Sequence, residues 1–403
     1  MTESAATNNR PLREKTGARP GLTDQSRSGE YMTAEFRAAH ASGENWASVA
    51  SELAELLEKE PLPDQALAFL YVSEALAEDI GSILTFLRSR LSIEHWIGTS
   101  GVGVCGSGRA YFGVPAASVM VAPFASDEFH IFEPLKTDAD LDAPELQKAI
   151  DRLQPIFGLV HGDPGAPQSL ATLSELARMG STYLVGGIAS GERSAPQIAD
   201  RVVDGGLSGV LFDGKTTVQV GISQACTPVG PVHRVTEGRE RIISTLDDRP
   251  ALEVLKEELD ADGSEHSIAS GRYHAALMVP GSDTGDFVVR NLMGIDPNNN
   301  MIAISGDVQA GDAIRFVRRD GAAAEQDLRR MLAELQKRLP GKPRGALYCS
   351  CVARGPHLFG TESREMMIIR DELGDLPLTG FYGNGEICND RFYGYTGVLT
   401  LFI

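Results

Sequence analysis

Apolar side chains recur at two spacings along the chain, and the two spacings predict different elements. After Asn45, the side chains of Val49, Leu53 and Leu57 fall on one helical face, and asparagine is a favoured residue at helix starts. Short apolar runs bounded by turn residues, such as 66–72, are typical of strands instead. The alternation of both patterns predicts an α/β (α+β) protein.

The same reading predicts the remaining elements. Helices are expected at 31–41, from Asn45 to Pro61, and at 75–90, 144–152, 170–178, 250–258, 323–339 and 362–372. Strands are expected at 66–72, 96–97, 102–105, 119–123, 129–132, 156–160, 182–185, 209–212 and 217–222, in a pair within 232–245, and at 275–279, 287–290, 301–305, 313–318, 345–352, 378–382 and 397–402. Residues 261–272 are predicted to form a loop.

A length of 403 residues suggests two domains rather than one core. Residues 1–30 hold few large apolar side chains and predict a disordered N-terminal tail. A cluster of proline and glycine before residue 233 predicts a boundary between domains 31–233 and 234–403. Each is expected to be a mixed, largely antiparallel sheet flanked by helices. No short tandem repeat is visible, and the sequence does not establish that the two halves share one fold.

The net charge of −18 narrows the range of partners. A strongly acidic surface repels phosphate backbones and anionic lipid, so neither nucleic acid nor membrane is expected. No apolar run approaches the roughly 18 residues of a membrane span, and the N-terminus lacks an apolar signal core. Five cysteines without framework spacing indicate reduced thiols and a cytoplasmic protein.

Two glycine-rich motifs match nucleotide-binding patterns without the context that those patterns need. Residues 209–216 fit a phosphate loop, but 217–222 alternates like a strand where a helix should begin. Asp213 and Gly214 are therefore predicted to turn a hairpin. Residues 101–106 fit a dinucleotide fingerprint, but further glycines occupy the place of its helix. No cofactor is expected.

The last quarter of the chain carries the most promising chemistry. Arg354 could hold a ligand carboxylate and Glu386 a ligand ammonium, as a zwitterion requires. Arg354 could also lower the pKa of the Cys351 thiol, while Cys349 is expected to be a small buried side chain. The alternative for Arg354 is an ion pair with Glu386 or with a surface acid. Neither Cys351 nor its neighbours show usual zinc spacing, so no metal is expected.

These segments resemble the FIST family, a pair of adjacent domains proposed as an intracellular small-ligand sensor. The resemblance covers roughly 46–403, and the order and spacing of its phrases make it specific. The matching phrases are 184–190, 206–210, 223–230, 235–236 with 246–248, 351–355 and 380–387. Ala225 and Asp248 depart from the family, which has glycine there. No F-box pattern is present, so a ubiquitin-ligase role is not implied.

The resemblance implies a pocket for an amino-acid-like metabolite. Besides Cys351, Arg354 and Glu386, its expected ligand-binding residues are Gly355, Asn384, Gly385, Gly186, Gly187, Ser190, Gln224, Ser100 and Gly101. For Gly186, Gly187 and Ser190, a tight turn is the alternative, and for Gln224 the alternative is packing within a linker. His161 and Asp163 are expected in a surface turn.

A sensor with no attached output segment must signal through a separate protein or through its own oligomerisation. Two other function classes stay open at this point. One is a cysteine-dependent hydrolase or transferase that uses Cys351, with His357 as the nearest histidine in sequence. The other is an interaction scaffold whose glycine-rich segments only shape the fold.

Overall fold

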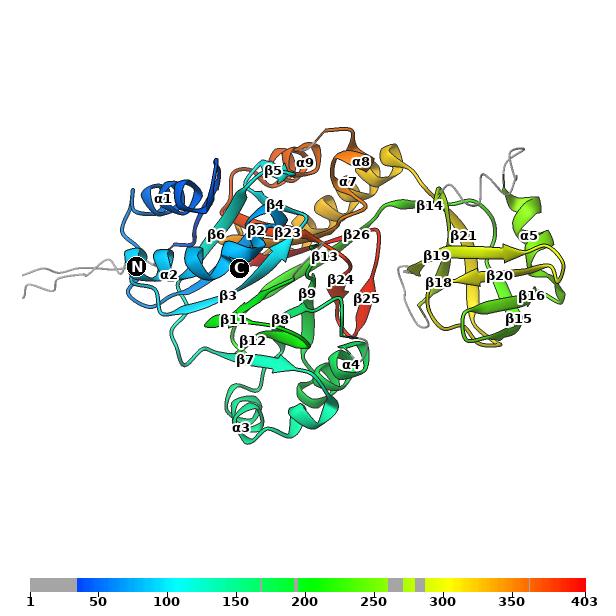
Figure 1. Cartoon of the computed structure of the whole chain (residues 1–403), viewed down its shortest axis with the longest axis horizontal. Helices are drawn as coiled ribbons and strands as arrows, with labels where there is room; N and C mark the ends of the chain where they lie inside the picture. The colour runs from blue at the N-terminus through cyan, green and yellow to red at the C-terminus, as the bar shows by residue number, and fades with distance from the viewer. Residues whose placement is uncertain (1–34, 167–168, 192–194, 260–270, 280–286, 362) are drawn as a thin grey trace, which may run out of the picture. The chain divides into compact units, whose positions relative to one another are not determined.

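The computed structural model describes residues 35–403 except 167–168, 192–194, 260–270, 280–286 and 362. Its strands form three six-stranded sheets and a fourth sheet that closes into a six-stranded barrel (Figure 1). The predicted mixed α/β fold class is confirmed. The predicted tail and most of the predicted loop at 261–272 lie outside the described residues.

Outside the barrel, the chain runs three times through one order of elements: strand, helix, strand, helix, strand, hairpin, strand. We call these the first, second and third repeats. The first comprises β1 (Arg37–Ser42), α1 (Trp46–Leu57), β2 (Leu67–Ser73), the short 3₁₀ helix η1 (Glu74–Asp79), α2 (Ile80–Leu91), β3 (His95–Gly101), the hairpin β4 (Gly103–Gly106) and β5 (Arg109–Phe112), and β6 (Ala116–Ala122). The second comprises β7 (Phe129–Leu135), η2 (Asp138–Asp142), α3 (Pro144–Leu153), β8 (Phe157–Gly162), α4 (Ser169–Gly180), β9 (Tyr183–Ile188), the hairpin β10 (Gln197–Ala199) and β11 (Arg201–Val203), and β12 (Leu207–Phe212). The third comprises β13 (Val218–Gln224), α7 (Gly321–Arg338), β22 (Gly345–Cys351), the short helix α8 (Gly355–Phe359), α9 (Arg364–Leu373), β23 (Leu378–Gly383), the hairpin β24 (Glu386–Cys388) and β25 (Arg391–Tyr393), and β26 (Thr396–Phe402).

Each repeat builds the centre of its own sheet but gives its hairpin to another sheet. The central pairs β2–β3, β8–β9 and β22–β23 are parallel. The hairpin that follows each pair then crosses over: β4–β5 joins β23, β10–β11 joins β3, and β24–β25 joins β9. Figure 1 shows the last exchange as the red strands β24 and β25 near the green strand β9. A cyclic exchange of hairpins therefore links the three repeats.

Three backbone hydrogen bonds close the exchange just beyond the ends of the central strands, and we call them the junction ring. Each repeat donates one bond to the repeat before it in the cycle. They run from Val102 N to Tyr382 O (3.1 Å), from Ser190 N to Ser100 O (3.3 Å) and from Asn384 N to Ile188 O (3.0 Å). Because buried backbone groups need partners, each of these turns depends on another repeat for its pairing.

The barrel is inserted into the third repeat between β13 and α7. Its closed strands are β15 (His233–Arg239), β16 (Ile242–Leu246), β20 (Met301–Ile304), β19 (Phe287–Asp296), β18 (Tyr273–Met278) and β21 (Ala313–Arg319), accompanied by β14 (Cys226–Pro228), β17 (Arg249–Pro250) and α5 (Ala251–Glu258). The chain enters through β14 and leaves through β21, and these two strands pair with Cys226 opposite Arg319. The insertion thus begins and ends at one point of the third repeat.

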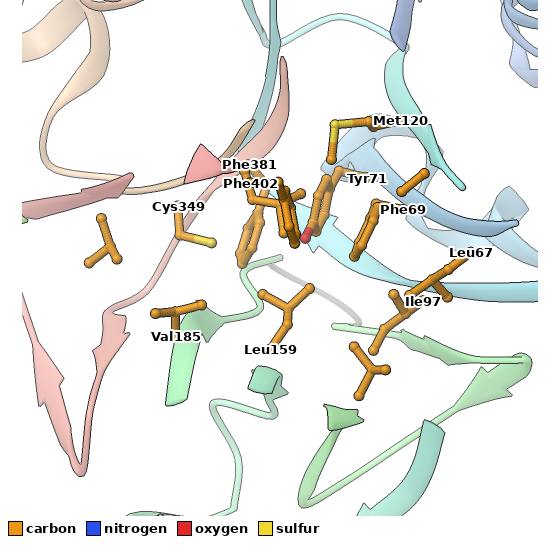
Figure 2. Close-up of a cluster of buried hydrophobic side chains, with 14 of the residues drawn as sticks. Leu67, Phe69, Tyr71, Ile97, Met120, Leu159, Val185, Cys349, Phe381 and Phe402 are labelled. Carbon is orange, nitrogen blue, oxygen red and sulfur yellow. The ribbon is translucent and has the colours of Figure 1, made fainter. Parts of the chain in front are cut away.

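One apolar core receives side chains from all three repeats. Tyr71 of β2 stacks on Phe381 of β23 with 5.0 Å between ring centroids, and Leu159 of β8 belongs to the same cluster (Figure 2). Beside them the Tyr71 hydroxyl lies 3.1 Å from Nε2 of His161, which is fully buried. The core therefore forms only when the three repeats are assembled.

Several sequence predictions are confirmed, and Asn45 illustrates why. Its side chain accepts a hydrogen bond from Ser48 N at 3.0 Å, and Ser48 Oγ accepts one from Asn45 N, which completes a capping box at the start of α1. The pair of strands expected within 232–245 is confirmed as β15 and β16. The sheets of the second and third repeats each contain strands from before and from after residue 233. The predicted domain boundary at residue 233 stays a prediction.

Three local predictions are wrong. The helix expected at 31–41 is strand β1 from Arg37, because backbone pairing with β6 outweighs the helix preference of its alanines. Asp213 and Gly214 do turn the chain, but β12 and β13 lie in different sheets instead of forming a hairpin. His161 lies within the buried strand β8, one residue before its end, and not in a surface turn.

Gly98, Gly186 and Gly380 hold the same position in the three repeats, opposite Leu70, Val160 and Tyr348. A Cβ atom on each would overlap the carbonyl oxygen of that partner. We expect Gly186→Ala to lower the free energy of unfolding by about 2–3 kcal/mol, because the clash is with backbone and φ is +142°. Urea denaturation measures this.

The matched control is Gly294→Ala, because Gly294 is exposed on β19 and a Cβ there meets nothing within 4 Å. Its free energy of unfolding should change by less than about 0.5 kcal/mol. Equal effects of the two substitutions would contradict the proposed steric role of Gly186.

Candidate functional site

Arg354 lies three residues after β22, immediately before α8, and is fully buried. Its Nε donates to Glu365 Oε1 at 2.7 Å, and both side chains have no exposed surface. The two terminal nitrogens donate to Ser223 O at 3.2 Å and to Ser223 Oγ at 3.4 Å. Burial alone would lower the pKa of Arg354, but the charge and hydrogen bond of Glu365, together with Tyr348 and Glu386, raise it above its ordinary value. The guanidinium therefore stays charged, and the alternative of an ion pair with Glu386 is wrong.

Glu365 completes this network and was missed by sequence reasoning. Tyr348 donates its hydroxyl to Oε1 at 2.7 Å, and the Ser350 hydroxyl lies 3.3 Å from both carboxylate oxygens. The signal was available, because Glu365 precedes Ile368 and Ile369 by three and four positions and therefore shares the buried face of α9. A carboxylate on an apolar helix face needs a buried partner.

Glu386 begins β24 and is also fully buried. Its Oε2 accepts hydrogen bonds from Thr396 N at 3.2 Å and from Thr396 Oγ1 at 2.6 Å. Its Oε1 has no hydrogen-bond partner among the described residues. Burial raises the pKa of Glu386 from its ordinary 4.5 to about 8, although Thr396 and Arg354 act in the opposite direction. The carboxyl is therefore largely protonated at neutral pH.

Cys351 ends β22 and is buried beside these charges. Burial, with a smaller contribution from Glu386, raises the pKa of its thiol to about 12. Arg354 does act to lower this pKa, as the sequence suggested, but too weakly to prevail. His357, the nearest histidine in sequence, is exposed on α8. The thiol is thus protonated at neutral pH, which does not favour a nucleophile.

The glycine-rich phrases meet Glu386 across a strand pair. Gly187 of β9 stands opposite Glu386, and Gly186 stands opposite Ile387. The carbonyl of Gly385 accepts a hydrogen bond from Ile188 N at 2.8 Å. The structure therefore brings together two phrases that lie about 200 residues apart in the sequence.

The predicted hydroxyl and amide residues lie at the junction ring. Ser190 Oγ donates to Tyr382 O at 2.9 Å and accepts from Val102 N at 2.8 Å, so its hydroxyl joins backbone segments. Ser100 is buried, with its Oγ 3.5 Å from Ser190 O, and a Cβ on the neighbouring Gly101 would lie 2.8 Å from Tyr382 O. Asn384 contributes its backbone to the ring, whereas its side chain is exposed.

The two remaining predicted residues are sequence neighbours of Arg354 and of its partner Ser223. Gly355 starts α8 with φ of +51°, and a Cβ there would lie 2.7 Å from the ring of Phe112. Gln224 ends β13, immediately after Ser223, and its Nε2 donates to Phe287 O in the barrel at 2.7 Å. Gln224 therefore connects the site region to the inserted barrel.

Two cavities lined by described residues lie away from this cluster. One of about 490 Å³ borders β7, α3 and β11, and one of about 620 Å³ includes Arg290, Asp312 and Arg391 in its wall. Cys351, Arg354 and Glu386 line neither. Within the described residues, no group of three or more His, Cys, Asp and Glu side chains is placed to hold a metal ion. No described helix is long and apolar enough to cross a bilayer.

Comparison with known proteins gives a consistent result along the chain. The model of the FIST N domain matches residues 66–249, and the model of the FIST C domain matches residues 251–389. Two strains of Mycobacterium tuberculosis each have an uncharacterised protein that is 31% identical over 357 residues, which is 84% of this chain and 91% of the relative. An uncharacterised protein of Mycobacterium bovis is 34% identical over 237 residues, or 55% of this chain and 61% of the relative.

The buried ion pair gives a first prediction for the site. Arg354→Met should lower the free energy of unfolding by about 3–5 kcal/mol, because it leaves the Glu365 carboxylate buried without its counter-charge. The double variant Arg354→Met with Glu365→Gln should lose less, since the amide still accepts from Tyr348 and carries no charge. Denaturant titration of both variants measures the difference, and a double variant less stable than the single one would contradict this account.

Glu386 gives a second prediction, for the pH dependence of stability. Its folded pKa is raised, so between about pH 5 and 8 the folded state holds a proton that the unfolded state has lost. The free energy of unfolding should therefore fall as pH rises through this window, by at most about 1.4 kcal/mol per unit from this group. Glu386→Gln should remove that contribution.

The measurement is the difference in free energy of unfolding between the two proteins at each pH. Groups that titrate equally in both proteins, including His233, contribute equally to both free energies and cancel in the difference. Burial acts against the charge of His233, but its hydrogen bonds to Asp247 and Glu258 raise its pKa above the ordinary value. A difference that stays constant from pH 5 to 8 would show that Glu386 is ionised throughout.

Proposed function

Because the chain belongs to the FIST family, with FIST N and FIST C domains in tandem, we propose that it is a sensory protein that binds a small amino-acid-like metabolite and signals through a separate partner. The ligand binds in the third repeat, among Cys351, Arg354 and Glu386. Glu386 takes the ligand's ammonium group, and Arg354 orients its carboxylate.

The observation that carries the proposal is the unpartnered Oε1 of Glu386. A fully buried carboxyl oxygen without a hydrogen bond is costly, and natural proteins retain few such atoms without a reason. An ammonium group supplies three donors and a compensating charge. Arg354 uses three of its five N–H groups on described partners, which leaves donors for a carboxylate.

The surroundings of the site support transmission of a signal. Glu386 belongs to the hairpin that leaves the third repeat and completes the second repeat's sheet. Ser223, which holds Arg354, is followed by Gln224 and its bond to the barrel. All three ligand-binding side chains are buried, so binding requires the packing around them to open. The segments therefore have a closed arrangement and an open one. A ligand that binds one arrangement more tightly increases the population of that arrangement.

We expect at least one of the twenty standard amino acids to raise the thermal unfolding temperature of the protein. A ligand at 100 times its Kd stabilises the folded state by about 2.7 kcal/mol. Glu386→Gln should abolish most of this shift, because the amide cannot compensate an ammonium charge. The readout is a thermal-shift titration with each amino acid.

Glu334→Gln is the matched control, since Glu334 is half exposed on α7 and pairs with Arg330. It should keep the full shift. If none of the amino acids changes the unfolding temperature, the sensor proposal is wrong and the scaffold alternative gains support.

A further inference from the structure

Glu386 differs from the residues that hold the same position in the other two donated hairpins. The position is defined by its pairing with the central strand: Glu386 opposite Gly187, Gln197 opposite Thr99 and Val104 opposite Phe381. All three are fully buried. The comparison therefore isolates what a carboxyl group adds at this point of the fold.

Both polar atoms of the Gln197 amide have hydrogen-bond partners. Its Oε1 accepts from Ser208 Oγ at 2.6 Å and from Ser208 N at 3.1 Å, and its Nε2 donates to Gly206 O at 3.3 Å. Glu386 reproduces the accepting half through Thr396, but its second oxygen has no described partner. Val104 has no polar group to satisfy. Among these three positions, only Glu386 has a polar side-chain atom with no described hydrogen-bond partner.

The charged groups near Glu386 are already paired with other residues. Arg354, after β22, forms its ion pair with Glu365 of α9. Cys349 and Cys351 of β22 are buried, and burial raises the pKa of each thiol, so neither supplies charge at neutral pH. On β26, Thr396 supplies only dipoles. On the strands that pair with β24, Arg391 of β25 forms an ion pair with Asp390, and Gly187 of β9 stands opposite Glu386. No uncommitted cation from these elements balances a Glu386 carboxylate, so the empty site favours the neutral acid.

We propose that an amine-bearing ligand binds this site with release of one proton from Glu386, and this inference rests on the proposed function. The ligand arrives as R–NH₃⁺ and the side chain begins as –COOH. On binding, the O–H bond of the carboxyl breaks, its electron pair stays on oxygen, and the proton passes to solvent. The product is the ion pair –COO⁻ with R–NH₃⁺. Affinity therefore rises with pH until Glu386 is ionised in the empty protein.

Calorimetric titration of the full chain tests this coupling. The probes are the L-amino acids that raise the unfolding temperature, each titrated at pH 6.5 in buffers of different ionisation enthalpy. We expect close to one proton released per ligand bound. Between pH 5.5 and 7, Kd should fall by up to tenfold per pH unit. Glu386→Gln should bind at least tenfold more weakly and release no proton.

A second variant keeps the test open if Glu386→Gln fails to fold. Thr396→Val removes the hydroxyl that stabilises the charged form of Glu386, while the backbone bond of residue 396 remains. It should bind the same amino acids, with the rise in affinity displaced to higher pH. A merely structural role for Thr396 would lower stability without moving this profile.

The outcomes separate the two proposals. If no amino acid binds, both fail. If one binds with no proton exchange and with equal affinity for Glu386→Gln, the coupling is overturned while the sensor proposal stands with a different contact for the amine. If proton release persists in Glu386→Gln, another group supplies it and the assignment to Glu386 is wrong.

Discussion

The cyclic exchange of hairpins is the constraint on which the rest of the structure depends. Each central parallel pair lacks an outer neighbour until another repeat supplies it, and the junction ring closes only when all three turns are in place. The apolar core obeys the same rule, because Tyr71 and His161 meet Phe381 from a different repeat. The stability of the fold and the geometry of the site therefore depend on all three repeats being assembled.

The residues of the candidate site all belong to the third repeat, and one of them lies on the hairpin that this repeat exchanges. Arg354 and Glu365 form a neutral pair inside the repeat, whereas Glu386 lies on the hairpin that leaves it. Low-dielectric surroundings make the unpartnered carboxyl oxygen costly and make its protonation state sensitive to any new charge. The same burial suppresses ionisation of Cys351, so the electrostatics suit recognition of a cation better than attack by a thiolate.

The sequence predicted local elements well and long-range pairing poorly. Periodicity located α1 and the strands of the barrel because those signals lie within a dozen residues. It could not reveal that β12 and β13 belong to different sheets, or that three repeats exchange hairpins, since such pairing is decided by contacts hundreds of residues apart. Glycine-rich phrases did indicate where the backbone is crowded. Glu365 was not predicted because the candidate residues came from glycine-rich segments, whereas Glu365 lies on the apolar face of helix α9.

The barrel enters and leaves the third repeat through the adjoining strands β14 and β21, and Asp320 N donates to Ala225 O just outside them. Because the two ends of the inserted barrel are paired with each other, the insertion does not change where β13 and α7 lie in the third repeat. A change in the length or lining of the barrel therefore need not alter the pairing of the three repeats. The barrel is in this sense a module that can vary by itself while the buried groups around Arg354 keep their partners.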